Sequence, residues 1–278
     1  MGCRREGQRP MQIELMGCTG AGKTTLVRSI VRTGGARGLD IALGDDVVLG
    51  RIGLSGLNST ILRKALLNLI AVSAGLAAWR AHGAIYRFAA RALMALPIGP
   101  VDKVVLWRSV VKRLGMYEIL RRSAGSRVVL VDEGVLQVAH YLFVHASIEP
   151  DMCRLHAYAR LAPLPDAVVY LRQPEELLTG RTLARGHKRI PGHTHDAVGR
   201  FIRRAIATFD TLAQQPDIAS RLLIVEGDGT VRAAAPDPET PALAMARRVV
   251  QSGIANTLDD QRSAQPLGPL GRSPGMYG

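Results

Sequence analysis

The residues whose types and spacing most constrain the chemistry are at 17–24, Gly-Cys-Thr-Gly-Ala-Gly-Lys-Thr, which match the phosphate-binding pattern Gly-x-x-x-x-Gly-Lys-[Ser/Thr]. Glycine lets the backbone curl around a phosphate with its N–H groups inward, and a Cβ at Gly17 or Gly22 would obstruct that curl. We expect Lys23 to reach the β- and γ-phosphates and the Thr24 hydroxyl to ligate Mg²⁺. The loop therefore predicts ATP and Mg²⁺ as cofactors, with the phosphates bound by Gly17, Cys18, Thr19, Gly20, Ala21, Gly22, Lys23, Thr24 and Thr25.

A second candidate site is the acidic pair Asp132-Glu133, which follows the apolar run at 128–131. Four apolar residues ending in Asp are typical of a buried strand that delivers a carboxylate to the sheet edge beside a phosphate loop. We expect Asp132 to hold Mg²⁺, directly or through water. Glu133 has two open roles: it could take the proton from an acceptor hydroxyl, or it could orient an attacking water. The alternative is an acidic pair on the surface, which the phosphate loop upstream disfavours.

A third signal is a cluster of cationic side chains at 181–189. Arg181 and Arg185 are four residues apart and so project from one face of a helix end, and Lys188 and Arg189 follow in a loop. Such a cluster could close over ATP and neutralise charge on the γ-phosphoryl oxygens, with Arg181 and Arg185 catalytic and Arg189 on the nucleotide. A plain basic helix end is an equal alternative, because arginine also complements the dipole at a helix C-terminus.

The elements that must position these side chains alternate between strands and helices, as a parallel α/β sheet requires. The run at 11–16 alternates apolar and polar residues like a strand, and the loop leads into a helix from Lys23, which disfavours a chance match of the loop pattern. Further strands are expected at 39–43, 127–132, 167–171 and 222–225, and helices at 60–96, 101–123, 135–159, from 174, at 196–214 and at 241–250. The pattern predicts an α/β, P-loop NTPase three-layer sandwich with a central, mostly parallel five-stranded sheet and a helical insertion.

The tract at 66–78 is apolar enough to raise the question of a membrane span. Arg80 ends it after fewer residues than the roughly twenty that a spanning helix needs, so a buried helix is the better interpretation. Farther along, Arg80, Arg87 and Arg91 fall on one helical face. We interpret them as a solvated face, with an acceptor-binding or membrane-contacting stripe as the alternative.

The net charge of +13 is carried almost wholly by arginine and favours anionic ligands. No RNA-binding or DNA-binding pattern is evident, so we expect a phosphorylated small molecule rather than nucleic acid, and contact with an acidic membrane surface stays open. Three scattered cysteines without a secretory signal indicate a cytosolic protein. The histidines at 187, 193 and 195 fit no structural zinc spacing and are interpreted as a polar loop.

Taken in order, these segments resemble the thymidylate-kinase-like group of nucleoside and nucleotide kinases. The similarity spans about 11–252 and is carried by the phosphate loop, the strand ending in Asp132, the run at 168–178 that leads into Arg181 and Arg185, and the segment at 223–230. In that group a strand and a Pro-Glu-Glu helix run into an arginine-bearing lid. The resemblance implies an ATP-dependent kinase, with 223–230 as the last strand and the loop that contacts the adenine.

The resemblance also sets the expected domain organisation. Disordered ends are expected at 1–10 and 254–278, with the kinase domain at 11–253, a helical acceptor-site insertion at 45–123 and a lid at 174–195.

The chain departs from that group where the acceptor should bind. Thymidylate kinases usually carry Asp-Arg where this chain has Asp132-Glu133, and the tract at 45–123 is long and apolar for a nucleotide pocket. Asp45, Asp46 and Arg51 are the acceptor-site candidates. The predicted activity is transfer of the ATP γ-phosphoryl group to a small-molecule acceptor, with Lys23, Glu133, Arg181 and Arg185 catalytic. An ATPase or nucleotide-dependent switch is the alternative, and assembly as a homodimer stays open.

Overall fold

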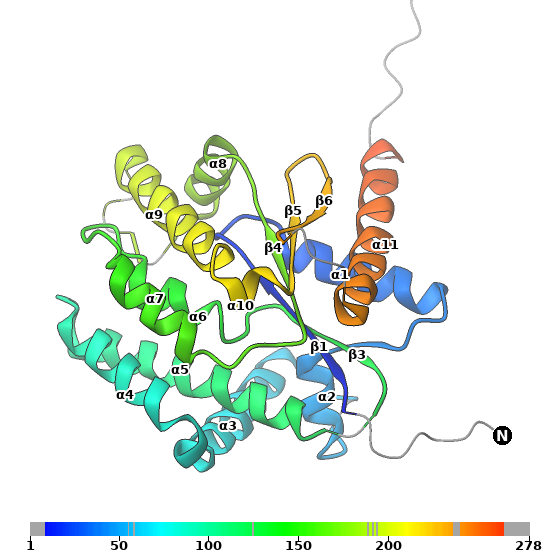
Figure 1. The fold of residues 1–278 in the computed structure, drawn as a ribbon, viewed down its shortest axis with the longest axis horizontal. Helices are drawn as coiled ribbons and strands as arrows, with labels where there is room; N and C mark the ends of the chain where they lie inside the picture. The colour runs from blue at the N-terminus through cyan, green and yellow to red at the C-terminus, as the bar shows by residue number, and fades with distance from the viewer. Residues whose placement is uncertain are drawn as a thin grey trace, which may run out of the picture.

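The computed structural model describes residues 9–54, 56–57, 59–123, 125–187, 189–190, 192, 194–235 and 240–263. Within them, six strands form one sheet in the order β2-β3-β1-β4-β5-β6 (Figure 1). The strands are β1 (Met11–Met16), β2 (Ile41–Leu43), β3 (Val128–Val131), β4 (Ala167–Leu171), β5 (Leu222–Val225) and β6 (Val231–Ala233). The first five are parallel to their neighbours, and β6 pairs antiparallel with β5. The predicted fold class is confirmed, with β6 as an added edge strand.

Strand β1 lies at the centre of the sheet, between β3 and β4. Its sequence alternates apolar and polar residues, yet the polar Gln12 and Glu14 are both buried. Helices cover both faces of a parallel sheet, so the polar positions of a central strand have no solvent to meet. Glu14 instead accepts a hydrogen bond from the N–H of Gln137 (3.1 Å).

Helices cover the sheet on both sides (Figure 1). On one side α1 (Lys23–Ala36) and α11 (Pro241–Ser263) pack together and against the strands. The other side carries further helices, including α5 (Pro100–Arg121), α6 (Val138–Phe143), α7 (Met152–Leu161) and α9 (His195–Ala213). Helix α8 (Glu175–Arg185) packs on α9, and α10 (Pro216–Ala219) precedes β5.

The predicted helical insertion is present as α2 (Gly44–Gly50), α3 (Thr60–Ala77), α4 (Trp79–Ala95) and α5. The single helix expected over 60–96 is wrong, because the chain leaves helical geometry at Ala78 (φ −84°, ψ 8°). Helices α3 and α5 approach each other very closely. A Cβ on Gly115 would lie 1.7 Å from the Ala71 carbonyl oxygen, and one on Gly75 would lie 2.2 Å from that of Val111. Only glycine at these positions lets the two backbones meet.

The helix expected over 135–159 is also divided, into α6 and α7. Pro150 precedes the new start, where the Asp151 carboxylate caps α7 by accepting from the N–H of Arg154 (3.0 Å). The carbonyl groups freed by the break are covered by arginines of other segments. Arg204 donates to the carbonyl oxygens of His145 (2.9 Å) and Ala146 (2.6 Å). Pro150 lies within 135–159 and is the local sequence signal for this break, whereas Arg204, which covers the freed carbonyl groups, is remote in sequence.

The apolar helix α3 is not buried as predicted. By length and composition it is the one helix among the described residues that could cross a membrane, but only 17% of it is buried inside the protein. Its residues Leu67, Ala71 and Gly75 face α5, and the opposite face is open.

The described ends of the chain are more ordered than predicted. Arg9 forms an ion pair with Asp166 (2.5 Å). Helix α11 continues to Ser263, beyond the expected end near 250. The predicted disorder at 1–8 and 264–278 lies outside the described residues.

Candidate active site

The phosphate loop connects β1 to α1 and has three glycines at positive φ: Gly17 (146°), Gly20 (82°) and Gly22 (93°). A Cβ on Gly17 would lie 2.8 Å from the Leu171 carbonyl oxygen, so packing against β4 excludes a side chain there. Gly22 has open space around it, and its requirement is conformational because its left-handed backbone disfavours any other residue.

The loop delivers the start of α1 uncapped, since Gly22 offers no side chain to the first-turn N–H groups. These donors and the positive end of the helix dipole are the groups that bind phosphate in such loops. Lys23 bends back and donates from Nζ to the carbonyl oxygens of Gly17 (2.8 Å) and Cys18 (3.1 Å). Burial lowers the pKa of Lys23 from its ordinary value, and the charges of Glu133 and Asp132 oppose part of that change.

Cys18 is a free thiol in the loop, and it is buried. Burial raises its pKa to about 12. A protonated, buried thiol is a poor nucleophile, so Cys18 acts as a small filler in the loop.

Asp132 follows β3 and faces the start of α1. The Thr24 hydroxyl donates to its Oδ2 (2.9 Å), while Oδ1 is buried without a hydrogen-bond partner among the described residues. Burial raises the pKa of Asp132, against the hydrogen bond from Thr24 and the charge of Lys23. A hydroxyl beside a carboxylate with one unused oxygen fits Mg²⁺, which prefers a few protein oxygens together with phosphate and water. No group of three His, Cys, Asp or Glu side chains with metal-site geometry occurs among the described residues.

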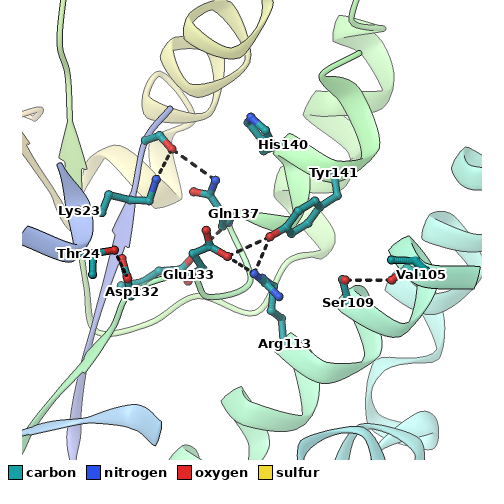
Figure 2. Close-up of polar contacts among 12 residues, drawn as sticks. Lys23, Thr24, Val105, Ser109, Arg113, Asp132, Glu133, Gln137, His140 and Tyr141 are labelled. Carbon is teal, nitrogen blue, oxygen red and sulfur yellow. Dashed lines mark hydrogen bonds and ion pairs between the residues drawn. The ribbon is translucent and has the colours of Figure 1, made fainter. Parts of the chain in front are cut away.

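Glu133 is held by two side chains that the sequence reasoning did not select (Figure 2). Arg113 of α5 forms an ion pair with it, and Tyr141 of α6 donates to its Oε2 (3.0 Å). Arg113 also donates to the Tyr141 hydroxyl (2.6 Å) and stacks over the tyrosine ring (4.8 Å).

These contacts fix the ionisation of Glu133. Burial alone would raise its pKa, but the charges of Arg113 and Lys23 and the hydrogen bonds from Tyr141 and Arg113 hold the pKa below its ordinary value. Glu133 is therefore a carboxylate at neutral pH, able to accept a hydrogen bond from a hydroxyl placed before it.

The phosphate loop and Glu133 line one cavity of about 1320 Å³. We call its two parts the nucleotide end and the acceptor end. The nucleotide end is lined by the loop residues 19–25 and by Leu171, Gln173, Val225, Glu226, Gly227, Asp228, Gly229 and Ile254. The segment predicted to contact the adenine, 223–230, therefore lies on this wall, in the turn between β5 and β6.

The acceptor end lies on the other side of Glu133. Residues at helical spacing on and just before α5 line it, together with side chains of α6 and the loop after it: Ile98, Asp102, Val105, Leu106, Ser109, Tyr141 and His145. Ser109 stands one turn before Arg113, and its hydroxyl donates to the Val105 carbonyl oxygen (3.0 Å) (Figure 2). Burial lowers the pKa of His145 to about 4, so it is neutral at physiological pH. The predicted insertion does contribute a wall of the cavity, through α5.

The three arginines predicted to act at the lid differ in what their guanidinium groups contact. Arg181 and Arg185 of α8 both line the cavity, and Arg181 donates to the Gly20 carbonyl oxygen (3.0 Å). Arg189 also lines the cavity, but its guanidinium donates to the carbonyl oxygens of His140 (3.3 Å) and Val144 (2.5 Å) at the end of α6. Lys188 lies outside the described residues.

The other acceptor-site candidates do not reach the cavity lining. Asp46 pairs with Arg63 of α3, and Arg51 donates to the Ile119 carbonyl oxygen (3.2 Å). Asp45 shares the first turn of α2 with Asp46. Of the three histidines, His187 lines the cavity, His195 begins α9 and His193 lies outside the described residues.

The missed residues had one usable signal in the sequence. Asp102, Val105, Ser109 and Arg113 recur every three or four residues, which places them on one face of the helix expected at 101–123. The spacing shows that these residues share one face of the helix, but it does not show which element that face contacts. The contact of Arg113 with Glu133 is therefore visible only in the folded structure.

No protein-family model matches the chain, and no curated protein matches it. Among solved structures, it is similar to deoxyadenosine kinase from M. mycoides with the products dCMP and dCDP, at 13% identity and a TM-score of 0.40, over 91% of this chain and 100% of that one. The same enzyme with dATP gives 12% identity and a TM-score of 0.37, over 90% and 100%. TT1252 from Thermus thermophilus gives 15% and 0.35, over 92% and 98%. Similarities this weak give no information on activity.

Proposed function

We propose that the chain is a cytosolic ATP-dependent kinase that transfers the γ-phosphoryl group to a hydroxyl of a small-molecule acceptor. The observation that carries the proposal is one cavity with two ends. The phosphate loop lines the nucleotide end, side chains of α5 and α6 line the acceptor end, and Glu133 lies between them. A hydrolase needs room there only for water, whereas the acceptor end is large enough to be lined by seven further side chains of α5, α6 and their flanking loops.

The roles follow from the contacts. Lys23 and the uncapped start of α1 would hold the phosphates, and Thr24 with Asp132 would hold Mg²⁺, which neutralises charge on the bound phosphates. Arg181 and Arg185 would face the γ-phosphoryl oxygens from α8. Phosphoryl transfer depends mainly on positioning and charge neutralisation, and these groups supply both.

Glu133 would orient the acceptor hydroxyl and accept its proton as the new O–P bond forms. A carboxylate with a lowered pKa is a weak base. A weak base is sufficient here, because in a loose transition state the acceptor hydroxyl loses its proton late. Arg113 and Tyr141 are positioning residues in this scheme, because they fix the carboxylate that touches the acceptor.

The acceptor end favours an uncharged hydroxyl compound, such as a nucleoside, over a nucleotide. Arg113 is already neutralised by Glu133, so it offers little to a second phosphate. The wall combines the apolar side chains Ile98 and Leu106 with the polar groups Asp102 and Ser109, which suits a ring that carries hydroxyls.

The test is ADP release by the purified full-length chain with nucleosides, nucleotides, sugars and lipid alcohols as acceptors. A kinase should idle slowly on water and accelerate with one acceptor class. Glu133→Gln should keep ATP binding and lower acceptor-dependent turnover roughly 10²–10⁴-fold. The exposed Glu176→Gln on α8 is the matched control and should leave the rate unchanged. A fast rate that no acceptor alters, with free phosphate as product, would favour the ATPase alternative.

A further inference from the structure

The helical insertion has an unusual distribution of charge. Residues 47–101 contain no Asp or Glu, although the whole chain has 23 acidic residues. The same stretch contains six cationic residues: Arg51, Arg63, Lys64, Arg80, Arg87 and Arg91. This part of the surface therefore presents positive charge without local neutralisation along the chain, and it should attract an anionic partner.

The outer face of α3 is apolar. Leu62, Leu69 and Leu76 recur every seven residues and so share one side of the helix, directly opposite the buried Leu67, Ala71 and Gly75. Leu69 is 64% exposed and Leu76 is 54% exposed, and Ile61 beside them is 84% exposed. Trp79, at the corner where α3 ends, is 44% exposed. A soluble surface rarely leaves so many large apolar side chains of one helix in water.

Helix α4 follows at once and places arginines on its exposed side. Arg87, Phe88 and Arg91 line a second hollow of about 290 Å³ together with Arg154 of α7, which is paired with Asp151 (3.3 Å). Arg80 stands at the start of the same helix. A guanidinium cluster of this kind suits phosphate groups, because each planar fork can donate two hydrogen bonds.

We propose that the outer faces of α3 and α4 bind the surface of an anionic lipid bilayer, with the leucines in the interfacial layer and the arginines on the headgroup phosphates. The combination of an apolar helix face, an interfacial tryptophan and flanking cations is what such a surface requires. A second copy of the chain is a poorer occupant, because it would bring a second set of mostly cationic side chains to the same place.

The packing of α3 determines that it lies on the membrane and does not cross it. Ala71 and Gly75 meet α5 backbone to backbone, so α3 cannot enter a bilayer without leaving the protein. Its ends are tied as well, since Arg63 pairs with Asp46 of α2 and Tyr86 of α4 donates to the Gly75 carbonyl oxygen (2.7 Å). Helix α3 is therefore held on the protein and exposes one face to a partner.

The experiment is flotation of the purified full-length chain with vesicles of phosphatidylcholine alone or mixed with phosphatidylglycerol, at low and high salt. The chain should float with the anionic vesicles, and high salt should weaken its binding. Leu69→Glu/Leu76→Glu should lower partitioning at least about tenfold, because it puts charge on the apolar face. Arg87→Glu/Arg91→Glu should lower binding to anionic vesicles by a similar factor.

The control is Arg28→Glu/Arg248→Glu, which makes the same charge change on exposed positions of α1 and α11, away from the insertion (Figure 1). Absence of wild-type flotation with anionic vesicles overturns the proposal, and so does a loss in the control equal to that in the α4 variant. Light scattering in solution adds a further outcome. A wild-type dimer that Leu69→Glu/Leu76→Glu converts to a monomer, without vesicle binding, would assign the face to a second copy instead.

Discussion

At the nucleotide end of the cavity most binding groups are backbone atoms of one short loop, whereas at the acceptor end they are side chains from α5, α6 and the loops beside them. The loop fixes its own geometry through glycine conformations, so it depends little on what packs around it. The acceptor end exists only when α5 is docked so that Arg113 reaches Glu133. A kinase of this design can keep one end constant and change its acceptor by altering a helix face.

The largest effect should come from Lys23, the cationic side chain that the phosphate loop itself contributes. Lys23→Ala should lower turnover at least about a thousandfold, because charge neutralisation and positioning supply most of the catalysis. ADP formation at saturating ATP measures it, with the exposed Lys64→Ala as control. A variant that turns over normally would remove the distinction between the two ends, since the loop would then not be catalytic.

At the acceptor end, Arg113→Met should lower acceptor-dependent turnover about a hundredfold while the ATP dissociation constant changes little. Without the arginine, the pKa of Glu133 should rise, so the acid limb of the pH–rate profile should move to higher pH. Arg108→Met, an exposed position on the same helix, is the control. Equal losses in ATP binding and turnover, with an unmoved profile, would make Arg113 merely structural.

Glu14 joins the two ends, because it lies on β1 before the phosphate loop and accepts from Gln137 at the start of α6. Burial raises its pKa to about 7, although N–H groups of Gln137, Leu136 and Val135 oppose that rise. The folded protein thus keeps a proton that the unfolded chain releases near pH 4.5. The free energy of unfolding should fall by about 3 kcal/mol as pH rises from about 4.5 to 7 and should level off above that.

Urea unfolding across this pH range tests that contribution. Glu14→Gln should flatten the pH dependence relative to the wild type, whereas the exposed Glu176→Gln should not. The difference between the two variants isolates Glu14 from the general effect of net charge. Identical pH dependences in all three proteins would mean that Glu14 is not protonated in the folded state.

The smallest effect should come from Ser109, which lines the acceptor end. Its hydroxyl already donates a hydrogen bond to the Val105 carbonyl oxygen. Its oxygen can still accept from the acceptor, so Ser109→Ala should raise the acceptor KM about tenfold with ATP unaffected. Ser73→Ala on the outer side of α3 is the control. Steady-state kinetics in both substrates would show whether the change follows the acceptor alone.

Features contained in consecutive residues could be predicted from the sequence. The phosphate loop, the strand before Asp132 and the helix carrying Arg181 and Arg185 each depend on contacts within a few residues. The parallel sheet followed from their order, because each apolar run could be assigned to a strand before its neighbours were known.

Features that depend on distant partners could not be predicted. The alternating pattern at 11–16 predicted a strand but not the burial of Gln12 and Glu14, which the position of β1 in the middle of the sheet decides. The break between α6 and α7 has a local signal in Pro150, but Arg204, which covers the carbonyl groups there, is remote in sequence. The open face of α3 has the composition of a core helix, and only the absence of a covering element among the described residues distinguishes it.

The contact of α3 with α5 at Gly75 and Gly115 has a mechanical consequence. Side chains at a helix interface can change rotamer and so accommodate a displacement. Two backbones in direct contact cannot adjust in this way. Helices α3 and α5 must therefore move as one rigid body, and the wall that carries Ser109 and Arg113 travels with it. A displacement of the outer surface of the insertion should therefore reach the acceptor end, and by reciprocity an acceptor that shifts α5 should alter the proposed binding at that surface.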